Sequence, residues 1–244
     1  MKNYETINIL GISVDKVTKA EALAAFEGFL EEDHCSQIVT LNPEMILEAQ
    51  ENSKFNKLLL DSELVFPDGI GLVYASKIKH QPLSERVTGI DFTRSALELL
   101  AKKGKSAYFL GAKPGIAEAA ARNIEKEIAG LKVVGARDGY FKAEDEEEIV
   151  NEINNSGADF LCLALGAPKQ EFFAHKYKDK LKCKVVIGIG GSFDVWSGTL
   201  KRAPEFYINH NIEWLYRLLQ EPSRIGRMAK LPLFLLKVAM HKEK

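Results

Sequence analysis

Cysteine is scarce in this sequence, and the few cysteines are not spaced as metal ligands or cross-links. Cys35, Cys162 and Cys183 are far apart, odd in number and form no CxxC pair. Their spacing predicts neither a disulfide framework nor a zinc site, and we expect the reduced thiols that are usual in the cytoplasm. The histidines, at positions 34, 80, 175, 210 and 241, also lack ligand spacing and are interpreted as surface or structural residues.

Long apolar runs and an excess of one charge are missing as well. The stretch MKNYETINILGISVD contains no apolar segment of signal-peptide length, and no run of about 18 uncharged apolar residues follows it. We therefore expect neither secretion through a standard signal peptide nor a membrane-spanning helix. The formal net charge of −1 argues against a general nucleic-acid binder, which would carry a strongly basic face.

The best-known phosphate-binding fingerprints are also absent. No GxGxxG follows a predicted strand and no GxxxxGK[ST] occurs, so a nicotinamide dehydrogenase and a P-loop NTPase both lose support. The chain has no Asp-x-Asp pair of the kind with which many nucleotide-sugar transferases hold a divalent metal. We expect neither a metal site nor a bound cofactor.

Short apolar runs that alternate with helical patterns are what the sequence does contain. The predicted strands are continuous runs rich in Val, Ile and Leu, namely SQIVTLN, SAYFLGA, LKVVGA, DFLCLALGA and CKVVIGIGG. Such runs are typical of parallel strands whose two faces are both covered. The sequence therefore predicts an α/β protein with a Rossmann-like parallel sheet and helices on both faces. TKAE, residues 18–21, has capping-box spacing and predicts a helix start.

Polar residues and glycines follow these runs directly, where ligands of open parallel sheets bind. They are Thr40 and Asn42 in TLN, Asp68 in FPDG, and the glycine-containing loops FLGAKPG, LGAPKQE and GIGGSFD. Glycine permits close backbone approach to a ligand, and amides at a following helix suit phosphate. For any one loop a simple strand end explains the glycines, and Pro-Asp-Gly around Asp68 is a common turn.

Taken together, the motifs resemble the WecG/TagA/CpsF glycosyltransferases. They are, in chain order, TLNPEM, PDGIGLVYASK, ERVTGIDF, YFLGAKPG, DGYF, LGAPKQE, GIGGSFDVWSG, KRAP and EWLYRLLQEPSR. The resemblance covers nearly the whole chain and is nearest to the TagA branch. It implies inverting, metal-independent transfer of N-acetylmannosamine from UDP-N-acetylmannosamine (UDP-ManNAc) to undecaprenyl-diphosphate-linked N-acetylglucosamine (GlcNAc). It also implies wall teichoic acid linkage-unit synthesis by a cytoplasmic protein, peripheral on the inner face of the bacterial membrane.

The resemblance assigns roles to individual residues. It makes Asp68 the general base for the attacking hydroxyl, while Thr40 and Asn42 bind the donor sugar or orient the base. Arg86 is a candidate for stabilising the charge of the departing UDP. The residues that match the nucleotide-sugar pocket are Gly111, Tyr140, Gln170, Gly190, Gly191 and Asp194. The arginines that match a tail folded over the pocket are Arg217, Arg224 and Arg227.

We expect residues 1–211 to form the catalytic domain and residues 212–244 a helical appendage. If EWLYRLL is helical, Trp214, Leu215, Leu218 and Leu219 form an apolar face. LPLFLLKVAM is too short to span a bilayer but suits its interface, and the basic residues around it suit anionic lipid. The appendage is therefore predicted to dock on an anionic membrane surface; a solvated basic end or ordinary helix packing is the alternative.

Several alternatives stay open. One is a Rossmann-type oxidoreductase or another nucleotide enzyme, and another is a non-catalytic nucleotide-sugar-binding scaffold. Within the family, the donor sugar could instead be N-acetylmannosaminuronic acid or a glucosyl group, because one or two pocket contacts can set such a preference. The sequence also leaves the oligomeric state open, a homo-oligomer included.

Overall fold

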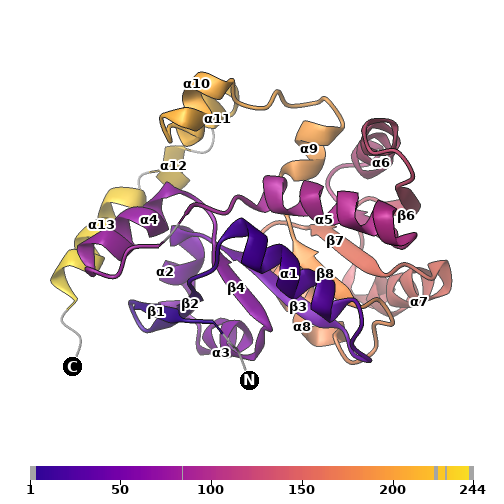
Figure 1. The fold of residues 1–244 in the computed structure, drawn as a ribbon, viewed down its shortest axis with the longest axis horizontal. Helices are drawn as coiled ribbons and strands as arrows, with labels where there is room; N and C mark the ends of the chain where they lie inside the picture. Colours follow the sequence, from indigo (N-terminus) through magenta and orange to yellow (C-terminus); the bar gives the residue numbers. More distant parts are fainter. Residues whose placement is uncertain (1–3, 84, 223–224, 229, 242–244) are drawn as a thin grey trace.

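A parallel sheet forms the centre of the computed structural model, which describes residues 4–83, 85–222, 225–228 and 230–241 (Figure 1). The spatial strand order is β4-β3-β8-β7-β5-β6, and every neighbouring pair is parallel. The strands are β3 (Ser36–Leu41), β4 (Leu64–Pro67), β5 (Ser106–Gly111), β6 (Lys132–Arg137), β7 (Phe160–Ala164) and β8 (Val185–Gly188). The predicted α/β fold class is confirmed.

Both faces of the sheet are buried, which explains the uninterrupted apolar strands. Side chains alternate between the two faces of a strand. In β5, Ala107 and Phe109 belong to one hydrophobic cluster, whereas Tyr108 and Leu110 belong to another on the opposite face. Apolar residues are therefore required at consecutive positions rather than at every second one.

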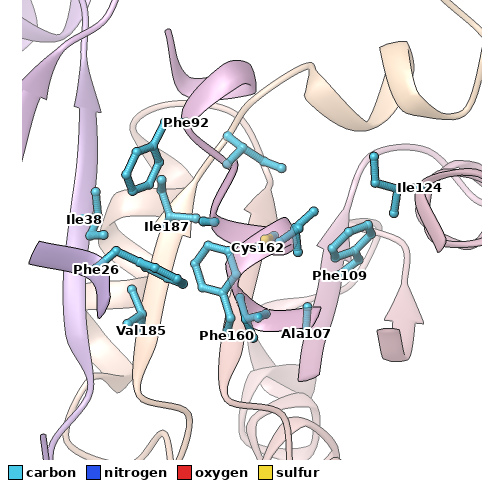
Figure 2. Close-up of a cluster of buried hydrophobic side chains, with 14 of the residues drawn as sticks. Phe26, Ile38, Phe92, Ala107, Phe109, Ile124, Phe160, Cys162, Val185 and Ile187 are labelled. Carbon is cyan, nitrogen blue, oxygen red and sulfur yellow. The ribbon is translucent and has the colours of Figure 1, made fainter. Parts of the chain in front are cut away.

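Helices cover each face. The first face carries α1 (Lys19–Phe29), α5 (Gly89–Lys103) and α6 (Ile116–Glu127). The second carries α2 (Pro43–Glu51), α3 (Ser53–Asp61), α7 (Glu146–Ser156), which a 3-10 turn (Ala143–Asp145) precedes, and α8 (Lys169–Tyr177). Figure 2 shows the first face, where Phe26 of α1 packs on Phe160 of β7 with ring centroids 4.8 Å apart. The predicted capping box is confirmed: the Glu21 N–H donates to the Thr18 side chain, and the Glu21 carboxylate accepts from the Thr18 N–H.

A small amino-terminal hairpin was not predicted. It pairs β1 (Thr6–Ile9) with β2 (Ile12–Asp15) through Leu10 and Gly11, whose φ angles are 55° and 87°. A two-residue hairpin turn of type I′ needs positive φ at both central positions, which leucine seldom supplies. The dipeptide Leu-Gly therefore carries little turn signal in the sequence.

The carboxy-terminal part of the chain is helical and returns to the core. It contains α9 (Ser192–Trp196), α10 (Glu205–Asn209), α11 (Glu213–Gln220), α12 (Ile225–Met228) and α13 (Lys230–Met240). α13 lies against α2 and α4 (Ile70–Ile78), and its Phe234 and Val238 are buried in the same hydrophobic cluster as Leu72 (Figure 1). A separate appendage is not confirmed, and the division after residue 211 stays a prediction. Among the described helices, none has both the length and the hydrophobicity required to span a bilayer.

Candidate active site

The carboxyl ends of the parallel strands meet at one edge of the sheet, here called the carboxyl edge. Residues that are scattered along the chain become neighbours there because the strand order differs from the chain order. Taken across the sheet from β4 to β6, the predicted site residues are Asp68, Thr40, Asn42, Gly190, Gly191, Gln170, Gly111 and Tyr140. The topology thus aligns the predicted base at one end of this edge and the predicted nucleotide contacts towards the other.

A cavity of about 220 Å³ lies at the β4 end of the carboxyl edge, and we call it the Asp68 pocket. Four predicted residues line it, namely Asn42, Asp68, Arg86 and Arg217. Its volume is below the roughly 300–1,000 Å³ that is typical of small-molecule sites. The Asp68 pocket therefore suits a sugar ring or a diphosphate rather than a whole nucleotide sugar.

Asp68 is fixed by the backbone on both sides. It follows β4 directly, and its N–H donates to the Leu41 carbonyl at 2.7 Å. The next residue, Gly69, has a φ of 94°, which favours glycine and completes the turn. The Gly89 backbone N–H, at the start of α5, lies near the Asp68 carboxylate and favours its ionised form. Asp68 is therefore both a turn residue and a carboxylate held in a pocket.

Gly89 explains how α5 comes so close to this carboxylate. A Cβ at position 89 would lie 3.2 Å from Thr40 Cγ2 and 3.4 Å from Asp68 Oδ2. Thr88 caps the helix, since its hydroxyl accepts a hydrogen bond from the Asp91 N–H at 3.3 Å. The ERVTGIDF motif thus contains a helix start that is shaped to support Asp68.

The environment of Asp68 suits a proton acceptor. Burial raises the pKa of Asp68 above its ordinary value. The positive charges of Arg86 and Arg217 oppose this rise, whereas the Glu213 carboxylate adds to it. A carboxylate with a raised pKa is a stronger base in its ionised form than an exposed aspartate. This end of the carboxyl edge therefore has a group that can take a proton from a hydroxyl.

Arg86 has an ion-pair partner that the sequence did not predict. Its Nη2 donates to Glu213 Oε2 at 2.7 Å, and the two side chains are only 18% and 10% exposed. Arg86 Nε is buried and has no hydrogen-bond partner among the described residues. Glu213 lies in the EWLYRLL motif, but a single acid in a basic tail gave no reason to select it.

Thr40 and Asn42 both have structural roles. The Asn42 Oδ1 accepts a hydrogen bond from the Met45 N–H at 3.0 Å and so caps α2, whose first residue is Pro43. The Asn42 amide nitrogen is the group that remains for a ligand in the Asp68 pocket. Thr40 does not line that pocket; its hydroxyl donates to the Gly188 carbonyl at 3.1 Å and ties β3 to β8.

Gly111 and Tyr140 lie at the far end of the carboxyl edge, outside the Asp68 pocket. A Cβ at Gly111 would lie 2.5 Å from the Ala164 carbonyl carbon, so packing of β5 against β7 accounts for this glycine. Tyr140 is 72% exposed and follows Gly139, whose N–H donates to the Ala112 carbonyl at 2.9 Å. The loop that carries Tyr140 is therefore bound to the end of β5, and its ligand role stays a prediction.

The remaining nucleotide-sugar candidates do not line the Asp68 pocket, but Gly190 and Gly191 lie next in sequence to residues that do. Gln170 is buried in α8, and its Oε1 accepts a hydrogen bond from the Gly190 N–H at 3.3 Å. Gly191 caps α9, and Asp194 lies half-buried in the first turn of that helix. None of these residues lines the Asp68 pocket, although Ile189 and Ser192 on either side of the two glycines do.

The tail arginines are only partly placed. Arg217, in α11, lines the Asp68 pocket. Arg224 lies outside the described residues, as does the side chain of Arg227, whose backbone belongs to α12. Trp214 and Leu231 also line the pocket, so α11 and the start of α13 form one of its walls. The sequence placed Trp214 only on an apolar helix face.

Metal-ligating side chains are dispersed. Within the described ranges, His, Cys, Asp and Glu residues nowhere gather in the groups of three or more that could hold a metal ion. Metal independence itself stays a prediction, because the reaction rather than the resting structure tests it.

Comparison with known proteins supplies an independent finding. Residues 7–244 match the glycosyl transferase WecG/TagA/CpsF family. A Bacillus spizizenii protein is 38% identical over 213 residues, which cover 87% of this chain and 82% of that protein. A Bacillus subtilis protein is 36% identical, covering 88% and 86%, and a Staphylococcus aureus protein is 31% identical, covering 99% and 95%. All three are named N-acetylglucosaminyldiphosphoundecaprenol N-acetyl-beta-D-mannosaminyltransferase.

Proposed function

Since this chain belongs to the WecG/TagA/CpsF glycosyltransferase family, we propose that it transfers N-acetylmannosamine from UDP-ManNAc to undecaprenyl-diphosphate-linked GlcNAc. The names of the relatives support the sugar that is transferred and the acceptor. The observation that carries the proposal is Asp68, a carboxylate with a raised pKa that lies in a sugar-sized pocket beside two arginines. The product would be a linkage unit for wall teichoic acid.

The proposed chemistry is a single displacement with inversion. A hydroxyl oxygen of the acceptor GlcNAc attacks the anomeric carbon of the donor while Asp68 accepts the hydroxyl proton. The bond between the anomeric carbon and the β-phosphate oxygen breaks, and its electron pair leaves with UDP. Asn42 contributes its amide nitrogen to the sugar, and Trp214 offers an aromatic wall to a pyranose ring.

Charge stabilisation of the leaving group would come from the protein. Arg86 and Arg217 both line the Asp68 pocket, so two positive charges lie where the diphosphate would leave. Fixed donors of this kind act without reorganisation as the charge of UDP develops. On this proposal a divalent cation is not required, in contrast to transferases that hold a metal on the diphosphate.

Incubating the protein with a panel of UDP-sugars and a soluble lipid-diphosphate-GlcNAc analogue tests the proposal. We expect acceptor-dependent release of UDP with UDP-ManNAc, and a rate with EDTA that stays within about twofold of the rate without it. UDP-N-acetylmannosaminuronic acid, UDP-glucose and UDP-GlcNAc serve as competing donors, and a protein without any sugar donor is the blank.

Each result has a defined consequence. Faster turnover with another donor would replace UDP-ManNAc and keep the family chemistry. Binding of UDP without turnover of any donor would favour the scaffold alternative. Loss of activity in EDTA that Mg²⁺ or Mn²⁺ restores would contradict the metal-independent mechanism.

We further propose that α13 docks the protein on the inner face of the cell membrane, where its lipid acceptor resides. α13 is apolar on both sides. Phe234 and Val238 face the core, while Leu233 and Leu236 are 49% and 57% exposed. A helix with two apolar sides is normally covered on both. Lys230 and Lys237 flank this exposed side in sequence and would favour anionic lipid.

The double substitution Leu233→Glu and Leu236→Glu is expected to abolish co-sedimentation with vesicles that contain anionic lipid. Both positions lie outside the Asp68 pocket, so turnover on the soluble acceptor analogue should stay within about twofold of the wild type. Leu60→Glu is the matched control, because Leu60 is 59% exposed on α3. Unchanged co-sedimentation of the double variant would contradict membrane docking through α13. If the wild type is a dimer and the double variant a monomer, this surface is a subunit interface instead.

A further inference from the structure

Glu171 is a buried acid that the mechanism above does not use. Glu171 is only 1% exposed, and its Oε2 has no hydrogen-bond partner among the described residues. Burial raises the pKa of Glu171 to about 7. Such a group costs stability wherever it is placed in a core, so its position between α8 and the sheet calls for a reason other than packing.

Among the described residues, Gln170 is the only one whose side chain hydrogen-bonds to the Glu171 carboxyl. Gln170 Nε2 donates to Glu171 Oε1 at 2.7 Å. The backbone carbonyl of Glu171 also accepts a hydrogen bond, from Gln37 Nε2 of β3 at 3.1 Å, which fixes this turn of α8 to the sheet. The carboxyl and its peptide group are thus held, and they hold Gln170 in turn.

The end of β8 is shaped to admit this pair. A Cβ at Gly188 would lie 2.4 Å from Gln170 Nε2 and 2.7 Å from Glu171 Oε1. Any larger residue at this position would displace both polar groups. The φ angle of Gly188 is one that any residue can adopt, so the backbone does not explain the glycine. The space that Gln170 and Glu171 occupy does explain it.

The orientation of the Gln170 amide affects the neighbouring turn. Because Glu171 engages the amide nitrogen, the Gln170 Oε1 is turned towards the Gly190 N–H and accepts its hydrogen bond at 3.3 Å. Gly190 has a φ of 51° and opens a turn whose flanking residues, Ile189 and Ser192, line the Asp68 pocket. Without the carboxyl, the amide would be free to rotate and could present its NH₂ group instead.

We propose that Glu171 is a positioning residue that, by holding the Gln170 amide, sets the turn at Gly190 and Gly191 in the form that binds the nucleoside diphosphate part of the donor. This inference rests on the proposed function, which makes a UDP-sugar the donor. Glu171 touches neither substrate nor reacting atoms and acts through Gln170 and the Gly190 N–H. Removing a residue that holds a ligand-binding group in place commonly lowers ligand affinity about tenfold or more.

Titration of each purified full-length variant with UDP tests the inference. Glu171→Met keeps the side-chain length but removes the acceptor for Gln170, so we expect UDP affinity to fall about tenfold or more. Glu171→Gln keeps an acceptor oxygen and should bind UDP within about threefold of the wild type. Gly188→Ala should weaken UDP binding as Glu171→Met does, because its Cβ displaces the Gln170 amide. Gly28→Ala, an exposed helical position with nothing within 4 Å of the new Cβ, is the matched control.

A purely structural role would give another pattern. In that case Glu171→Met would lower the midpoint of thermal unfolding and leave the UDP affinity of the folded protein unchanged. On our inference the midpoint stays near the wild-type value, because a buried acid with an unpartnered oxygen is removed. If Glu171→Met does not fold, Gly188→Ala decides. If the wild type binds UDP and both Glu171→Met and Gly188→Ala bind it with the same affinity, the positioning role is wrong while the proposed function stands. A wild-type protein that binds no UDP would overturn the proposed function as well.

Discussion

The Asp68→Asn variant is expected to lose sugar transfer by roughly a hundredfold or more while its affinity for UDP changes little. Asparagine has the same size and the same turn chemistry, so the loop after β4 should keep its shape. It cannot accept the proton of the attacking hydroxyl, and the loss should therefore fall on kcat. Initial rates of UDP release at saturating acceptor analogue, together with UDP titration, measure both quantities.

Asp33→Asn supplies the control for an aspartate-to-asparagine change at an exposed position, and its transfer rate and UDP affinity should equal those of the wild type.

The pH dependence gives a second check. Because burial raises the pKa of Asp68, protonation removes the base at a higher pH than for an exposed aspartate. Wild-type kcat/KM should therefore fall as the pH is lowered through that raised pKa, and the residual activity of Asp68→Asn should lack this limb. Near-normal turnover by folded Asp68→Asn would leave Asp68 as a turn residue only.

Sequence patterns could predict the sheet because its strands are buried on both faces. Runs such as SAYFLGA and DFLCLALGA became β5 and β7, and the residues directly after such runs converged at the carboxyl edge. That edge is set by strand direction alone, so Asp68 and Asn42 could be placed on the same edge of the sheet without knowledge of the strand order. Their proximity follows from the pairing of β3 with β4.

Other features depend on contacts between distant segments and had no local signal. The pairing of Arg86 with Glu213 joins the chain before α5 to α11, and a charged residue alone does not indicate its partner. The α13 helix buries Phe234 against α2 and α4, whereas its composition resembled that of an interfacial segment. Apolar residues show that a helix needs covering but not whether protein or lipid covers it. Glu171 was not selected from the sequence, because an acid in the GAPKQE motif would ordinarily be exposed to solvent.

The second large effect is expected at the ion pair between Arg86 and Glu213. Arg86→Met removes a donor that we place on the leaving diphosphate, and loss of one such preorganised donor lowers turnover by roughly a hundredfold. It also leaves the Glu213 carboxylate buried without its cation, which costs roughly 3 kcal/mol of folding stability. The same carboxylate would raise the pKa of Asp68 further, because the opposing charge of Arg86 is lost.

The double variant Arg86→Met and Glu213→Met separates these contributions. With both charges removed, Glu213 is no longer a buried carboxylate without its cation, and Arg217 still opposes the rise in the pKa of Asp68. The free energy of unfolding should therefore return to within about 1 kcal/mol of the wild type. Turnover should not return, since the diphosphate still lacks its donor. Denaturant unfolding and initial rates measured on the four proteins of this cycle give both coupling energies. If the double variant recovered turnover along with stability, Arg86 would serve to neutralise Glu213 beside Asp68, and the charge of the leaving group would have to be met by other residues such as Arg217.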